Sequence, residues 1–280
     1  MTMPLPLLSP FLHPSPAFVS FDQVGFQTHP HFRKITRTNL SLLIATRQGL
    51  IRARLHGGNA ATGTYLAFID AHVRVAPDWL STPLRLLQER SQRLVNFVNV
   101  ALDPLTFEPL SGWQGMGTTA TLSISLAQSW GGAAAANQIV HSSHSSQLHS
   151  TQAPLLPDLS SPITLGMFAT SKAWWNQGGM DPGLQVWGGE NVEISLRTWL
   201  CGGDIVVAMD SFVAHTFRKK FPYKISMEKV LRNYARVAAV WMDGKYRSSF
   251  YHENGIRLRK SGGLPFDIGN ITGIHEHAVD

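Results

Sequence analysis

The sequence predicts an α/β fold with a mostly parallel central sheet flanked by helices. Two short, almost uninterrupted apolar runs, 64–69 and 94–100, are typical of buried strands. Segments with helical periodicity lie before, between and after these runs, and strands that alternate with helices characterise this fold class. About 44% of the 280 residues are hydrophobic, which is enough for a sizeable core.

The first elements follow an irregular start. Residues 1–17 are rich in proline and are expected to be irregular, and a β-type run at 18–21 leads to Asp22. Over 48–62 the spacing of apolar residues predicts a helix, which Gly63 is well placed to end. We expect residues 18–280 to form a single domain.

A helix is predicted from Trp79 to about Arg90, with Asp78 as its cap. The later segment 131–161 is rich in Ala, Ser and His and is expected to be a surface insert of low complexity. Its histidines could be read as a metal cluster, but a solvated loop is the favoured interpretation because nothing nearby makes them rigid. These histidines are His141, His144 and His149.

The glycine pair Gly188-Gly189 precedes a predicted helix that ends at a second pair, Gly202-Gly203. Its apolar stripe, Val192, Leu196 and Trp199, predicts one buried face. A strand over 204–209 and an amphipathic helix over 228–242 follow.

Charge and cysteine content limit the classes of function. The chain has 24 Lys+Arg, 18 Asp+Glu and a formal charge of +6, which would suit an anionic partner, but it has no nucleic-acid-binding motif. Cys201 is the single cysteine, so neither an intrachain disulfide nor an all-cysteine zinc site is expected. No apolar run is long enough to span a membrane, and prolines interrupt the apolar N-terminus.

The first candidate site is Asp70-Ala71-His72, directly after the apolar run 64–69. Ligands in open α/β sheets bind beyond the carboxyl ends of strands. A carboxylate and an imidazole two residues apart can face one cation, and mixed oxygen and nitrogen ligands suit a manganese-like ion. The alternative is an ordinary Asp at a strand end beside an exposed His.

Two further segments carry polar groups that suit a phosphorylated sugar. Trp187 could stack on a sugar ring beside Glu190 and the free N–H groups of a helix start, although a tight turn would also explain the glycines. His215 could complete a set of three metal ligands, and Arg218 could neutralise phosphate oxygens, although a solvated basic turn is the alternative. Together these segments predict a metal-assisted enzyme that uses a nucleotide diphosphate donor.

Several long motifs, in this order along the chain, resemble the polypeptide N-acetylgalactosaminyltransferases. Residues 46–90 are similar to the family's REGLIRAR segment, its strand ending in Asp-Ser/Ala-His and the helix that follows. Residues 162–203 contain the WGGEN core, and AHTFRKKFPY at 214–223 resembles a further family motif. The resemblance covers about 45–275, apart from the insert.

The resemblance implies a glycosyltransferase-A (GT-A) fold and the Mn²⁺-dependent, retaining transfer of N-acetylgalactosamine from UDP to Ser or Thr of a polypeptide. Asp70, His72 and His215 would be the metal ligands. Glu190 and Tyr223 would act with Asp70 in catalysis, with Glu190 orienting the sugar and acceptor. The UDP-sugar pocket would be lined by Asp22, Arg47, Ala71, Trp187, Arg218 and Tyr223.

The sequence also departs from the family pattern. The family's first strand, its anchor and stem, and its C-terminal lectin domain have no recognisable counterpart, and the acceptor segment is degraded to GMGTTATL at 115–122. Cys201 stands where the family has a disulfide cysteine. The alternative is therefore a truncated, catalytically inactive relative that acts as a binding module. The family resemblance implies the Golgi lumen as its location.

Overall fold

The computed structural model describes residues 17–21, 49–70, 72–106, 108, 110, 119–131, 159–217, 225–272 and 274. Its helices are α1 (Leu50–Ala60), α2 (Ser81–Glu89), α4 (Lys172–Asn176), α5 (Glu190–Leu200), α6 (Met227–Trp241) and α7 (Gly244–Glu253). Its longer strands are β1 (Ala17–Phe21), β2 (Tyr65–Ile69), β4 (Arg93–Ala101) and β9 (Asp204–His215). The shorter ones are β3 (Val73–Val75), β5 (Thr119–Leu122), β6 (Gln128–Gly131), β7 (Leu159–Ser160) and β8 (Phe168–Ser171).

The predicted α/β class is confirmed, but the sheet is mixed rather than mostly parallel. Strand order is β1-β2-β8-β4-β9-β3, with β7 also on β9, and β5 and β6 form a separate two-stranded sheet. Among the described pairs only β4–β9 is parallel. Alternation of strands and helices does not fix strand direction, and β1, β8 and β3 each return antiparallel to their neighbours.

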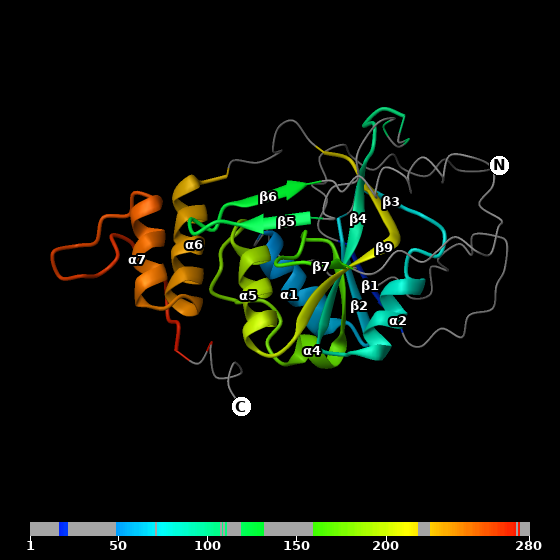
Figure 1. The fold of residues 1–280 in the computed structure, drawn as a ribbon, viewed down its shortest axis with the longest axis horizontal. Coiled ribbons are helices and arrows are strands. Elements are labelled where there is room, and N and C mark those ends of the chain that lie inside the picture. The colour runs from blue at the N-terminus through cyan, green and yellow to red at the C-terminus, as the bar shows by residue number, and fades with distance from the viewer. Residues whose placement is uncertain are drawn as a thin grey trace, which may run out of the picture.

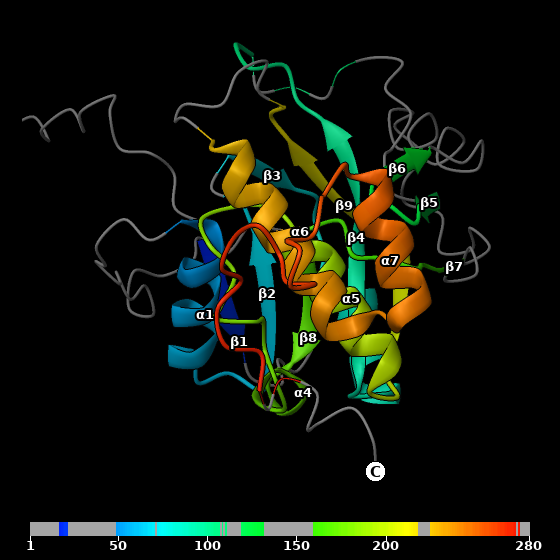
Figure 2. The same ribbon diagram turned by 90° about the vertical axis from the view of Figure 1, so that its left-hand side faces the viewer.

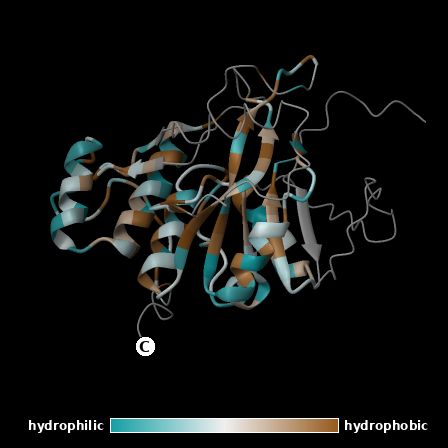
Figure 3. Cartoon of the chain, turned by 45° about the vertical axis from the view of Figure 1, so that its right-hand side comes forward, coloured by the Kyte–Doolittle hydropathy of each residue, from teal (hydrophilic) through white to brown (hydrophobic). Residues whose placement is uncertain are grey.

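Helices cover both faces of the central sheet (Figure 1). Alternate residues of β2 point to opposite sides, as the pleat of a strand requires. Tyr65, Ala67 and Ile69 pack in one cluster with α2, whereas Leu66 and Phe68 pack in another with α4 and α5. The strands carry most of the hydrophobic colour in Figure 3, so the core lies on both sides of the sheet.

A further layer of helices lies beyond α5. In Figure 2, α6 runs between α1 and α7. A third apolar cluster joins these helices through Ile51 of α1, Val192 of α5, Ala238 of α6 and Phe250 of α7. The last described segment is tied to this layer, since Arg236 donates to the carbonyls of Ile268 and Asn270.

Two predicted helix ends differ from the observed ones. α1 ends at Ala60, before Gly63, with Ala61 as its C-cap. α2 starts at Ser81, and Asp78 lies in the turn before it with a φ of 56° rather than acting as the cap. The insert predicted over 131–161 lies almost wholly outside the described residues. No described helix has the length and apolarity that a bilayer crossing requires.

Candidate metal and sugar-nucleotide site

Asp70, His72 and His215 come together at one end of the sheet. Each offers one ligand atom, and these atoms all lie within 4.8 Å of one another. The Nε2 atom of His215 is 3.1 Å from Oδ2 of Asp70. The rings of His72 and His215 are 4.4 Å apart between centroids. The three side chains that the sequence predicts as metal ligands therefore converge on one small volume.

Pairing of β3 with β9 accounts for this convergence. Val73 lies opposite His215, and the N–H of Thr216 donates to the carbonyl of His72 at 3.2 Å. The register between β4 and β9 also shifts after Phe97, where β9 bulges, and the re-paired end places His215 opposite Ala101. A bulge re-aims the residues that follow it, so β9 reaches the triad as one continuous strand.

Arg54 of α1 contacts the triad of Asp70, His72 and His215 through Asp70. Its Nη2 atom lies 3.4 Å from Oδ1 of Asp70, and the Arg54 side chain is 3% exposed. Burial alone would raise the pKa of the Asp70 carboxyl, but the contact with His215 and the charges of Arg54, His215 and His72 outweigh it. The pKa of Asp70 is consequently lowered, and the carboxylate is held in the ionised form that binds a cation.

Glu190 is the first residue of α5 and follows a turn that contains Trp187. The N–H of Gly188 donates to Oε2 of Glu190 at 2.7 Å. Burial raises the pKa of the Glu190 carboxyl, and the nearby charge of Arg54 acts in the opposite direction. The Asp70 carboxylate also raises the pKa of Glu190, so the charges of both Arg54 and Asp70 act on this carboxyl.

The donor set fits a divalent cation. One carboxylate oxygen and two imidazole nitrogens form the mixed set that manganese-like ions accept. Nδ1 of His215 and Nε and Nη1 of Arg54 are buried without a hydrogen-bond partner among the described residues. Buried polar groups are normally satisfied. The free imidazole nitrogen can accept a partner from outside this part of the chain, whereas the Arg54 N–H groups are donors that require an acceptor and not a cation.

The structure brings only some of the predicted residues together. Asp70, His72 and His215 share one site. Glu190, the first residue of α5, is close enough for the charges of Arg54 and Asp70 to act on it, and Trp187 lies in the turn before it. The other predicted residues, Asp22, Arg47, Ala71, Arg218 and Tyr223, lie outside the described residues. Two residues around this site were not predicted: Arg54 contacts Asp70, and Asn233 contacts the turn that precedes Glu190. The sequence shows only that such an arginine or asparagine lies on the inner face of a helix, and it does not show which groups the side chain contacts.

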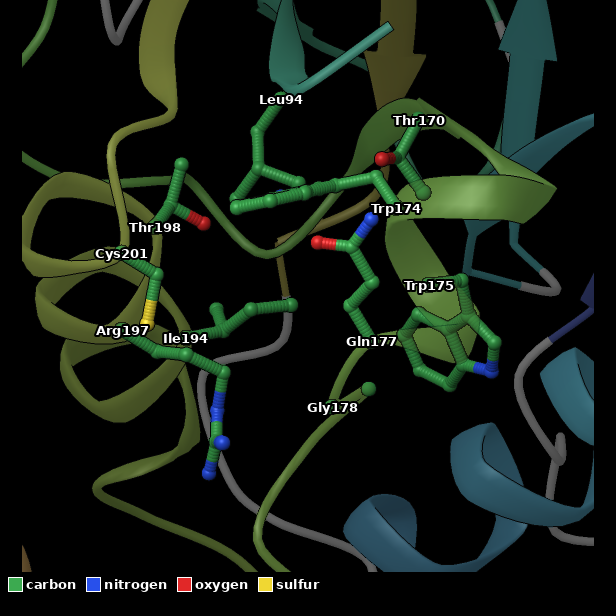
Figure 4. Close-up of a pocket in the computed structure, with 11 residues that line it drawn as sticks. Leu94, Thr170, Trp174, Trp175, Gln177, Gly178, Ile194, Arg197, Thr198 and Cys201 are labelled. Carbon is green, nitrogen blue, oxygen red and sulfur yellow. The ribbon is translucent and has the colours of Figure 1, made fainter. Parts of the chain in front are cut away.

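A second recess lies elsewhere and lacks this chemistry. Figure 4 shows it between α4 and α5, where Trp174 and Cys201 are among the residues that line it. Tyr65 pairs with Ser171, which puts α4 at the end of β2 opposite to Asp70. Cys201 is a free cysteine, as expected, and burial raises the pKa of its thiol.

The chain is similar to several known proteins. A family model described as glycosyl transferase family 2 matches residues 38–141. Polypeptide N-acetylgalactosaminyltransferase 12 of Mus musculus is 36% identical over 209 residues, covering 74% of this chain and 34% of that protein. Polypeptide N-acetylgalactosaminyltransferase 14 of Homo sapiens is 34% identical over 234 residues, covering 80% of this chain and 38% of that protein. The chain thus spans little more than a third of the length of these relatives.

A solved structure has the same fold. The crystal structure of GalNAc-T7 with UDP, GalNAc and Mn²⁺ matches with a TM-score of 0.65 and 26% sequence identity. The match covers 82% of this chain and 40% of that one.

Proposed function

The chain belongs to the polypeptide N-acetylgalactosaminyltransferase family, and on that premise we propose that it is a Mn²⁺-dependent, retaining transferase. Its donor would be UDP-N-acetylgalactosamine, and its acceptor a Ser or Thr of a polypeptide. The observation that carries this proposal is the convergence of Asp70, His72 and His215 within 4.8 Å, next to Arg54. A solved relative that contains UDP, GalNAc and Mn²⁺ supports the choice of donor and ion.

In this proposal Asp70, His72 and His215 hold the ion. A bound divalent ion supplies a Lewis acid that offsets the charge of the leaving diphosphate. Arg54 keeps Asp70 ionised and contacts its Oδ1, while Oδ2 lies on the side of His215, where an ion held by the triad would sit. The ligands are thereby pre-oriented.

Glu190 would orient the sugar and the acceptor. Its backbone contact with Gly188 fixes one carboxylate oxygen, and its burial keeps water away from the reacting groups. Trp187 would present an apolar face to the sugar ring. The roles of Asp22, Arg47, Ala71, Arg218 and Tyr223 in the donor pocket and in catalysis, and the location in the Golgi lumen, stay predictions from the family resemblance.

The experiment compares the wild type with Asp70→Ala in two assays, Mn²⁺ binding by calorimetry and Mn²⁺-dependent transfer from UDP-N-acetylgalactosamine to a Thr-rich peptide. Loss of a ligand should weaken Mn²⁺ binding by about 100-fold or more and abolish transfer. Asp210→Ala is the matched control, because Asp210 lies on β9 but is exposed and bonds only to Thr82 in the described part of the chain.

Three outcomes decide the proposal. Transfer that is lost in Asp70→Ala and kept in Asp210→Ala supports it. Mn²⁺ binding that is lost in Asp70→Ala, in a wild type that transfers no sugar, overturns the enzymatic part and leaves a binding module. Equal behaviour of the wild type and Asp70→Ala in both assays overturns the metal site itself.

A further inference from the structure

The turn at 185–189, which connects to Glu190, has an unusual backbone. Val186 has a φ of 57°, and Gly188 and Gly189 have φ values of 95° and 87°. Glycine adopts such angles readily, but a β-branched residue such as Val rarely does. Strained residues of this kind persist only where their surroundings hold them, and they cluster at functional sites.

Asn233 of α6 holds this turn from one side. It is fully buried, and its Nδ2 donates to the carbonyls of Gln185 at 2.7 Å and of Gly188 at 2.9 Å. A longer contact of 3.3 Å reaches the carbonyl of Trp187. Its Oδ1 accepts from the N–H of Gln185 at 2.9 Å. One side chain therefore engages both ends of the turn through its amide.

The start of α1 holds the turn from the other side. The N–H of Leu50 donates to the carbonyl of Val186 at 2.8 Å. At Gly49 a Cβ atom would come within 2.3 Å of the Cα of Val186, so the two backbones are in direct contact. Val186 is thus fixed between α1 and the residues that Asn233 binds.

The turn also fixes the side chain of Glu190, because the N–H of Gly188 donates to the Glu190 carboxylate. Gly189 is the N-cap residue of α5 and provides no side chain for capping. The conformation of 185–189 consequently sets where both Trp187 and Glu190 lie.

We propose that Asn233 is a positioning residue of the transfer site, which holds the turn at 185–189 so that Trp187 and Glu190 face the donor sugar. This inference rests on the proposed function. It adds a residue that touches neither the metal ligands nor the reacting groups, and acts only through the backbone of the turn.

The test is a mutant cycle between Asn233→Ala and Val186→Gly. Misplacement of about 1 Å can cost about 100-fold, so Asn233→Ala should lower kcat/KM for transfer by about 10- to 100-fold. Mn²⁺ affinity should change by less than about twofold, because the triad is untouched. A glycine at 186 adopts the left-handed backbone without strain, so the loss from Asn233→Ala should be clearly smaller in the Val186→Gly background.

Asn96→Ala is the matched control. Asn96 is also fully buried and its amide binds a loop, through the carbonyl of Ile163 and the hydroxyl of Thr164, but it belongs to β4. Asn96→Ala should lower the free energy of unfolding while the folded protein keeps its kcat/KM. Hydrogen exchange of the peptide that covers 185–189 provides a measurement that does not need activity, and Asn233→Ala should accelerate it.

Unchanged hydrogen exchange at 185–189 in Asn233→Ala would overturn the inference, as would an equal loss of kcat/KM in Asn96→Ala. If the wild type itself has no transferase activity, the proposed function fails. The exchange measurement then still decides whether Asn233 holds the turn.

Discussion

Arg54 and Asp70 join helix α1 to the end of β2 through a contact of 3.4 Å between Nη2 and Oδ1. The guanidinium is almost fully buried, whereas the Asp70 side chain is 29% exposed, and its other oxygen lies 3.1 Å from Nε2 of His215. Burial raises the pKa of Glu190, and the charge of Arg54 partly opposes that rise. One buried cation is therefore shared between the triad and the start of α5.

Replacing Arg54 by Met should destabilise the protein and weaken metal binding together. Loss of one partner of a buried ion pair is costly, but Asp70 is partly solvated, so we expect about 2 kcal/mol of unfolding free energy. The pKa of Asp70 should rise, and Mn²⁺ affinity should fall by about tenfold. Urea unfolding and calorimetry measure the two effects. Arg52→Met is the control, since Arg52 is exposed on the same helix, and equal losses in both variants would contradict this role of Arg54.

Stability should depend on pH through Glu190. Its pKa is raised in the folded protein above the ordinary value of 4.5, mainly by burial. As pH rises above 4.5 the unfolded chain loses this proton first, so the folded state is progressively destabilised until Glu190 also ionises. Glu190→Gln removes this component. Its melting temperature relative to the wild type should therefore increase with pH above 4.5, and a constant difference from pH 4 to pH 8 would contradict the raised pKa.

Gly49 should be the least replaceable of the glycines with a left-handed backbone. Gly49→Ala combines a φ of 91° with a contact of 2.3 Å to the backbone of Val186, so we expect a loss of about 3 kcal/mol. Gly202→Ala is the matched variant, because Gly202 has a φ of 81° but nothing within 4 Å of an added Cβ. Its cost should be about 1 kcal/mol. Chemical denaturation of both variants measures the difference, and similar costs would show that the contact with Val186 relaxes freely.

Arg236 should be essential for holding the segment around 268–270 against α6. Its Nε and Nη2 bind the buried carboxylate of Asp181 at 2.7 and 2.9 Å, and its Nη1 binds the carbonyls of Ile268 and Asn270. Arg236→Met should cost about 3–5 kcal/mol. It should also expose the segment around 268–270 to limited proteolysis. Lys229→Met on the exposed side of α6 should do neither, and protease resistance equal to the wild type in Arg236→Met would count against this anchor.

Much of the fold could be predicted because local signals and tertiary environment agree. The apolar runs at 64–69 and 94–100 became β2 and β4, and the glycine pair before Glu190 precedes α5, as expected. Whether neighbouring strands run parallel or antiparallel could not be predicted. The residues at the end of a strand are similar whether a turn or a crossover helix follows. The continuation of β9 past the bulge to His215 was also hidden, because the strands that pair with its last residues, β4 and β3, are far away in the sequence.

The candidate site divides in the same way. Asp70 and His72 could be predicted as a pair because two residues in one extended segment stay close in any fold. Arg54 and Asn233 could not be predicted, since their importance comes from what tertiary packing leaves beside them. Arg54 sits on the buried face of α1, and Asn233 meets a turn whose strain no residue pattern reveals.

The pairing of β9 with β3, β4 and β7 also bears on how the chain folds. β9 completes the sheet only after loops of many residues have closed, and such long-range pairing slows folding. A nascent chain that lacks β9 carries Asp70 and His72 but not His215, so it has two of the three ligands. If the triad binds a cation as proposed, strong binding would be acquired late, and its onset during refolding would report the moment at which the sheet closes.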